Sequence, residues 1–216
     1  FSASGCDEES IDFLLVVNTP FLKIASADLS NFPLLEHTAK TGKPIILSTG
    51  MAEMKLVKNA VELISEYNLN IAIMQCTSTY PSRFNEINLN VIGTYLKEFP
   101  NSIIGYSGHE LGIAIPGVAV ALGAKIIERH FTLDRTMKGG DHSASLEPHG
   151  FAKMIRDIRH IENAMGIPEK RIQESEKPIF IKLAKSIVTA KNIQKNEVIS
   201  KDMLTTKGPG SGVSPT

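Results

Sequence analysis

Residues 103–131 read IIGYSGHELGIAIPGVAVALGAKIIERHF. The runs 103–107 and 125–131 have the length and the isoleucine content of buried strands. Between them, 111–122 is long enough for a helix, and Gly123 follows where a glycine commonly ends one. The stretch therefore predicts a strand, a helix and a second strand parallel to the first.

The same rhythm extends over most of the chain. We expect further strands at 21–26, 44–49 and 71–77, and helices at 8–17, 32–40, 53–67, 89–99 and 150–165. FSAS at the N-terminus reads as the stub of another strand, and Gly42 and Gly166, like Gly123, lie where helices should end.

Such repeats form either an open doubly wound sheet or a closed (β/α)8 barrel. The sequence has no glycine-rich dinucleotide loop, and polar residues follow each predicted strand. Because all strand ends open into one mouth in a barrel, this pattern favours the α/β TIM barrel.

We expect residues 1–166 to be the C-terminal part of that barrel, with its last five strands plus a stub, and the remaining strands to precede Phe1. Residues 167–184 are charged and read as a linker. Residues 185–216 read as short strands and turns that begin a second domain, too short to build a core of its own.

Composition excludes several classes of protein. Of the 216 residues, 42% are hydrophobic and 21% charged, which is typical of a globular protein. Lys plus Arg and Asp plus Glu are both 23, so no net charge attracts nucleic acid. We expect no membrane segment or signal peptide, and with only Cys6 and Cys76 present a cytoplasmic location is the default.

Two histidines lie at the ends of neighbouring predicted strands. Because side chains two apart share a face of a strand, Ser107 should point with His109, and Glu128 with His130. Two imidazoles at adjacent strand ends can bind one divalent ion and leave positions open for water and substrate. The alternative is two histidines that simply pack in the core.

Lys23 lies within the apolar run FLKIAS, where an unpaired ammonium is costly to bury, so it implies an anion. The hydroxyls of Ser26, Ser48 and Ser107 also fall at strand ends and suit phosphate or carboxylate oxygens, unless they cap the following helices.

The polar loop TLDRTMKGGDHSASLEPHG follows the last strand, and long loops at a barrel mouth are often functional. Its Asp141, and Tyr80 in the STYPS loop, could contact sugar hydroxyls. Asp141 could instead cap the HSAS turn, and the Tyr80–Pro81 pair could merely shape a turn.

The strings FLKIAS, KPIILSTGM, QCTSTYP, IIGYSGHE, ALGAKIIERHFTLD and KGGDHSASLEP together resemble the sialic acid synthase (N-acetylneuraminate synthase) family. The resemblance implies a TIM barrel followed by an antifreeze-like β-clip (SAF) domain, of which 185–216 would be the start. It implies condensation of phosphoenolpyruvate with N-acetylmannosamine, or its 6-phosphate, to N-acetylneuraminic acid and phosphate by C–O cleavage. A divalent metal is implied, Mn²⁺ first with Mg²⁺ or Co²⁺ as alternatives, as is a domain-swapped homodimer.

The resemblance also implies roles for single residues. His109 and His130 would be metal ligands and, with Glu128, catalytic residues. Phosphoenolpyruvate would be held by Lys23, Ser26, Ser48 and Ser107, and the sugar by Tyr80 and Asp141. Two alternatives stay open: a synthase of another nonulosonic acid, legionaminic or pseudaminic, and a non-catalytic sugar-binding relative.

Overall fold

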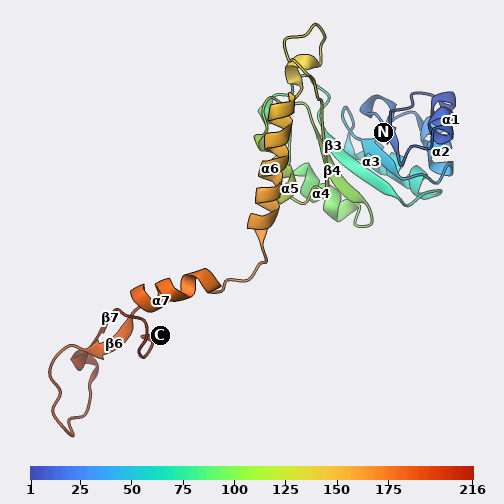
Figure 1. Ribbon diagram of the computed structural model, residues 1–216. Helices are drawn as coiled ribbons and strands as arrows, with labels where there is room; N and C mark the ends of the chain where they lie inside the picture. The colour runs from blue at the N-terminus through green and yellow to red at the C-terminus, as the bar shows by residue number, and fades with distance from the viewer. The chain divides into compact units, whose positions relative to one another are not determined.

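The computed structural model describes residues 1–216, which divide into two compact units, Phe1–Gly166 and Ile167–Thr216. The first unit alternates strands and helices (Figure 1). Its strands are β1 (Leu22–Ile24), β2 (Ile45–Ser48), β3 (Ile71–Cys76), β4 (Ile103–Gly108) and β5 (Ile126–Arg129). Its helices are α1 (Glu8–Val16), α2 (Phe32–Lys40), α3 (Met54–Ser65), α4 (Val91–Glu98), α5 (Ala114–Ala121) and α6 (Pro148–Met165).

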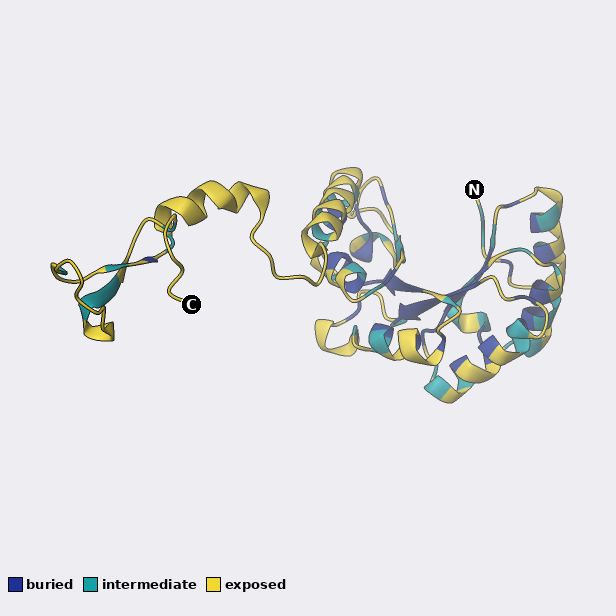
Figure 2. Cartoon of the chain, turned by 90° about the horizontal axis from the view of Figure 1, so that it is seen from below, coloured by how far each residue is buried: buried dark blue, intermediate teal, exposed yellow.

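All five strands of the first unit are parallel and lie in chain order, β1-β2-β3-β4-β5. The sheet curls as half a barrel does, and helices lie along its outer face, as Figure 2 shows from below. The FSAS stub adds one parallel bridge, from Ser4 to Lys23 on β1. The predicted parallel strand–helix repeat is therefore confirmed for this unit.

Local signals set several helix ends. The Asp7 carboxylate accepts a hydrogen bond from the Ser10 N–H at 2.7 Å and so caps α1. The three glycines predicted to end helices, Gly42, Gly123 and Gly166, all have positive φ, which a residue without a Cβ adopts at little cost.

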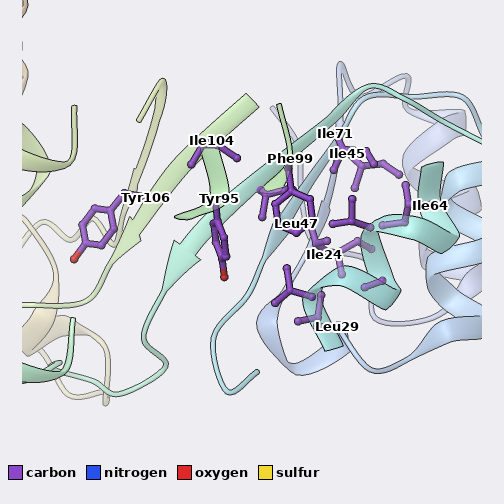
Figure 3. Packing of buried hydrophobic residues seen from close by; sticks show 14 of the residues in the cluster. Ile24, Leu29, Ile45, Leu47, Ile64, Ile71, Tyr95, Phe99, Ile104 and Tyr106 are labelled. Carbon is purple, nitrogen blue, oxygen red and sulfur yellow. The ribbon is translucent and has the colours of Figure 1, made fainter. Parts of the chain in front are cut away.

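The core lies between the sheet and its helices. Leu47 on β2, Ile73 on β3 and Ile64 on α3 are fully buried in one cluster, part of which is drawn in Figure 3. Burying one such side chain contributes about 1.5–3 kcal/mol. This packing fixes the alternation along each strand, so that residues next to the core residues face the open, concave side.

Some elements are shorter than the sequence predicts. β5 ends at Arg129 because the chain then leaves β4: Phe131 bridges Leu146, whose N–H donates to the carbonyl of His130 at 2.8 Å. β1 ends at Ile24, since Ser26 begins a short 3-10 helix. Of the predicted functional residues, Lys23 and Glu128 lie on these two strands, whereas Ser26 and His130 lie just past their ends.

The second unit contains helix α7 (Lys177–Leu183) and strands β6 (Ser186–Thr189) and β7 (Leu204–Lys207), which pair antiparallel. Helix α7 falls within 167–184, the segment that the sequence suggested was only a linker. Pro178 at its start and Lys182 in its last turn are typical helix signals, which the charged composition obscured. None of the protein's helices combines the length and hydropathy of a membrane span.

Candidate active site

The carboxyl ends of the parallel strands meet at one edge of the sheet, where a pocket of about 420 Å³ opens. This volume is typical of a small-molecule site. Eight of the nine site residues inferred from the sequence line it: Lys23, Ser26, Ser48, Tyr80, Ser107, His109, Glu128 and His130.

Lys23 supplies the pocket's positive charge. Its side chain is 13% exposed, and Nζ donates to Ser48 Oγ at 2.8 Å and to the carbonyl oxygen of Ile24 at 3.1 Å. Burial lowers the pKa of Lys23, and the negative charge of Glu128, whose Oε2 lies 3.8 Å from Nζ, opposes that shift. Because the ion pair is longer than a hydrogen bond, the ammonium is only partly compensated and favours an anion beside it.

Glu128 is the only acidic residue that lines the pocket. It pairs in register with Ser107 on β4, whose hydroxyl donates to Glu128 Oε1 at 2.7 Å. The carboxylate is thus held by one neighbour and still 41% exposed toward the pocket. A carboxylate in this state can accept a proton from a bound reactant.

The site hydroxyls are not helix caps. The residue before the first 3-10 helix is Ala25, and the one before α3 is Glu53, so neither Ser26 nor Ser48 caps a helix. Ser26 Oγ instead accepts the Gly50 N–H at 2.9 Å. Ser78 Oγ, which also lines the pocket, is buried without a partner, and a buried hydroxyl in that state has a hydrogen bond to offer a ligand.

The two histidines that follow β4 and β5 face each other, with ring centroids 5.1 Å apart. His109 Nδ1 lies 2.9 Å from the carbonyl oxygen of Thr77, which can only accept. The proton therefore sits on Nδ1, and Nε2 of His109 carries a free lone pair. Burial, and next the neighbouring His109, lower the pKa of His130, which favours the neutral ring that a metal needs.

Tyr80 packs on both imidazoles, with ring centroids 4.2 Å from His109 and 5.4 Å from His130. Asp141 is the one predicted residue that does not line the pocket. Its Oδ2 lies 3.6 Å from His130 Nδ1, and its side chain makes no capping hydrogen bond to the turn that follows. Asp141 therefore belongs beside the histidine pair, where it favours a proton on His130 Nδ1.

His109 and His130 can offer a divalent cation two nitrogen donors. No group of three or more His, Cys, Asp or Glu side chains in the chain is placed to hold a metal. With two imidazoles as the protein's share, the other coordination positions would be left to water and substrate oxygens, as an open catalytic site requires.

A buried network that was not predicted from the sequence lies directly behind the histidines. Arg129 and Glu110 form an ion pair of 2.6 Å with both side chains fully buried, and the Tyr106 hydroxyl donates to the same carboxylate at 2.6 Å. The available signal was an arginine inside the apolar run IIERHF, the same kind of signal that singled out Lys23.

The chain is similar to several known proteins. A family model described as the NeuB family matches residues 1–170. N-acetylneuraminate-9-phosphate synthase of Homo sapiens is 48% identical over 216 residues. N,N'-diacetyllegionaminic acid synthase of Legionella pneumophila is 37% identical over 221 aligned positions.

Among solved structures, the sialic acid synthetase of Leptospira borgpetersenii, crystallised with citrate, superposes on 82% of this chain with a TM-score of 0.76 and 36% identity. The chain covers 60% of the human relative, 62% of the Legionella relative and 62% of the Leptospira chain, and the two sequence matches span 100% of the chain. It therefore spans about three fifths of the length of the proteins it matches.

Proposed function

The chain belongs to the NeuB family, and on that basis we propose that the intact protein is an N-acetylneuraminate synthase. It condenses phosphoenolpyruvate with N-acetylmannosamine, or with its 6-phosphate, and releases inorganic phosphate by C–O cleavage. The observation that carries the proposal is one pocket lined both by a partly compensated ammonium, Lys23, and by two neighbouring imidazoles, His109 and His130.

The anionic substrate fits the Lys23 side. Its carboxylate and phosphate oxygens accept hydrogen bonds from the Lys23 ammonium and from the hydroxyls of Ser26 and Ser48. Ser107, which donates its proton to Glu128, would turn toward the substrate to join them. Such charge-assisted bonds are shorter and about twice as strong as neutral ones. The unpartnered Ser78 hydroxyl adds a donor on the same side.

His109 and His130 would hold a divalent cation, Mn²⁺ first, with Mg²⁺ or Co²⁺ as alternatives. When bound, that cation supplies Lewis-acid polarisation of the sugar's aldehyde oxygen. Tyr80, stacked on both rings, and Asp141, beside His130, are positioned to orient the sugar at this end.

The chain's own residues handle charge and protons during the reaction. C3 of phosphoenolpyruvate forms a bond to the aldehyde carbon as the carbonyl π bond breaks and the aldehyde oxygen takes up a proton from solvent, which leaves a cationic centre at C2. Water adds to C2, and Glu128 accepts the proton that this water loses, since it is the only acid lining the pocket. As the tetrahedral centre collapses, the new C2 hydroxyl becomes the keto group and the bond from C2 to the phosphate oxygen breaks. The hydroxyl proton passes to the departing phosphate, which Lys23 stabilises.

The acceptor is argued from the relatives. The three carbons of phosphoenolpyruvate join at C1 of the sugar, so a phosphate on C6 of the sugar appears on C9 of the product. The name of the human relative, a 9-phosphate synthase, favours the 6-phosphorylated acceptor. The Legionella relative supports a second candidate, legionaminic acid synthesis from a 2,4-diacetamido sugar.

We also infer the architecture of the intact protein. The half-barrel sheet would form part of a (β/α)8 barrel, and 185–216 the start of an antifreeze-like β-clip domain. The superposition on 62% of the Leptospira chain supports the barrel. A domain-swapped homodimer and a cytoplasmic location complete this proposal.

The test uses the intact protein and phosphoenolpyruvate labelled with ¹⁸O in its bridging oxygen. N-acetylmannosamine, its 6-phosphate and a 2,4-diacetamido sugar are compared as acceptors, with Mn²⁺ present. We expect labelled inorganic phosphate in an acceptor-dependent reaction, fastest with one of the two N-acetylmannosamine substrates. Label retained in the sugar acid contradicts C–O cleavage. No phosphate with any acceptor supports the non-catalytic, sugar-binding alternative.

A further inference from the structure

Each proposed metal ligand has a buried charged residue as its sequence neighbour. Glu110 follows His109, and Arg129 precedes His130. Because side chains alternate along a strand, Glu110 and Arg129 point away from the pocket toward the core side, while the histidines point into it.

Glu110, Arg129 and Tyr106 form a buried hydrogen-bonded network, in which Arg129 Nε alone has no partner. Arg129 Nη1 lies 2.6 Å from Glu110 Oε1, and Tyr106 donates to Glu110 Oε2 at 2.6 Å. The guanidinium also binds main chain: Nη2 donates to the carbonyl oxygen of Glu110 at 2.5 Å, and Nη1 to that of Gly112 at 3.1 Å. Arg129 thus holds the backbone on both sides of Leu111.

These main-chain contacts lie where the sheet itself stops. The ladder between β4 and β5 ends at the pair Gly108 and Arg129, one residue before the two histidines. No strand pairing therefore fixes the distance between His109 and His130, whereas the Arg129 side chain ties the segment after His109 to the residue before His130.

Gly108 makes room for the network. A Cβ at this position would lie 2.6 Å from Glu110 Oε2 and 2.6 Å from a ring carbon of Tyr106. Only a residue without a side chain lets the Glu110 carboxylate reach over β4 to Arg129. The second glycine of GYSGHE, Gly108, is therefore what allows the network to form at this strand end.

We propose that Glu110 and Arg129 are positioning residues that set the separation of His109 and His130, and hence the affinity of the site for a divalent cation. The inference rests on the proposed function, because it concerns the same two ligands. Replacing a buried ion pair by apolar residues of similar volume often leaves stability unchanged. Loss of positioning can therefore be measured without loss of folding.

The test is a Mn²⁺ titration of the intact protein, followed by the electron paramagnetic resonance of free Mn²⁺. In the triple variant Tyr106→Phe, Glu110→Leu, Arg129→Met, every member of the network becomes apolar and no buried charge is left unpaired. We expect a Tm near that of the wild type, Mn²⁺ binding weaker by about 10- to 100-fold, and a matching fall in kcat that added Mn²⁺ partly restores.

Two further variants complete the design. Arg129→Lys keeps the charge but loses the fork that reaches two carbonyls, so it should weaken Mn²⁺ binding less than the triple variant, and it serves if the latter does not fold. The matched control, Lys58→Met with Glu98→Leu, removes an ion pair that is also 2.6 Å long but exposed on α3 and α4. It should bind Mn²⁺ as the wild type does.

The outcomes separate the two claims. Wild-type Mn²⁺ affinity in the folded triple variant or in Arg129→Lys, with affinity lost in His109→Ala and His130→Ala, overturns the positioning role alone. Wild-type affinity in His109→Ala and His130→Ala overturns the metal assignment of the proposed function, and the positioning role with it.

Discussion

At the scale of single residues, Lys23 is a largely buried ammonium that needs an anion beside it. Its ammonium has one hydroxyl, one carbonyl and a carboxylate at 3.8 Å as neighbours. A hydrogen bond to a charged group contributes about 1.5–3 kcal/mol. In the intact protein we therefore expect Lys23→Met to lower kcat/KM for phosphoenolpyruvate about 10- to 100-fold, with a much smaller effect on the KM for the sugar.

Steady-state kinetics with each substrate varied in turn check this expectation. Lys40→Met is the matched control, because Lys40 pairs with Glu36 on the exposed face of α2. Equal losses for both substrates in Lys23→Met would rule out a role in holding the anion.

A second prediction separates the pocket histidines from a nearby one. His142 lies in the polar loop, where its Nδ1 bonds the Thr132 hydroxyl at 2.7 Å. We expect His109→Ala and His130→Ala each to abolish measurable activity, with partial recovery in excess Mn²⁺, because one imidazole remains as an anchor.

His142→Ala should retain most activity. Phosphate release by the three variants, assayed over a range of Mn²⁺ concentrations, decides the matter. If His142→Ala lost activity in this way while His109→Ala kept it, the loop rather than the strand ends would carry the ligands.

The sequence predicted which side chains gather in the pocket, because a charged residue in an apolar run and a histidine just past one are visible in the letters. Lys23 and His130 were found in this way. Ser78 was not found, since nothing in QCTSTYP indicates that its hydroxyl lacks a hydrogen-bond partner. Asp141 does not line the pocket, and its position beside His130 depends on the fold of a loop.

At the scale of elements, strand existence and order followed from periodicity, whereas the strand ends did not. The end of β5 depends on Leu146, which lies 17 residues after Arg129 in sequence and pairs with the chain at His130 and Phe131. A local pattern contains no information on such a contact. Helix α7, KPIFIKL, was missed because the charged run that leads into it, 168–177, resembles a linker.

Substituting alanine for each of two glycines tests how closely side chains pack against β4 and α4. Gly108→Ala on β4 forces a Cβ to within 2.6 Å of buried atoms of Tyr106 and Glu110, so it should lower the free energy of unfolding by about 1–3 kcal/mol. Gly93 lies within α4 with no neighbouring atom inside 4 Å of an added Cβ. Gly93→Ala should therefore raise that free energy by about 0.5–1 kcal/mol.

Urea denaturation of the intact protein measures both changes. If both substitutions shifted the midpoint in the same direction, the close approach of the network over Gly108 would be in doubt.

At the scale of the whole molecule, the open sheet is the feature that limits the stability of this chain on its own. Outside the ladder, edge strand β1 has one isolated bridge, from Lys23 to Ser4, and the chain just past edge strand β5 has one, from Phe131 to Leu146. Phe21, Ile46 and Ile126 line an apolar cavity of about 490 Å³. Parallel sheets are normally covered on both faces. We expect residues 1–216, expressed alone, to aggregate or to lack a cooperative thermal transition.

Light scattering and calorimetry of that 216-residue chain provide the check. A monomer with a single cooperative melt would show that the half-barrel is sufficient for a stable core.

The central claim is that His109 and His130 jointly hold a divalent cation at the mouth of this pocket. The most direct measurement is an anomalous difference map from crystals of the intact protein grown with Mn²⁺. We predict one peak within about 2.1 Å of a nitrogen of each ring, on the pocket side. A strong peak elsewhere, with none between these two rings, would contradict the account.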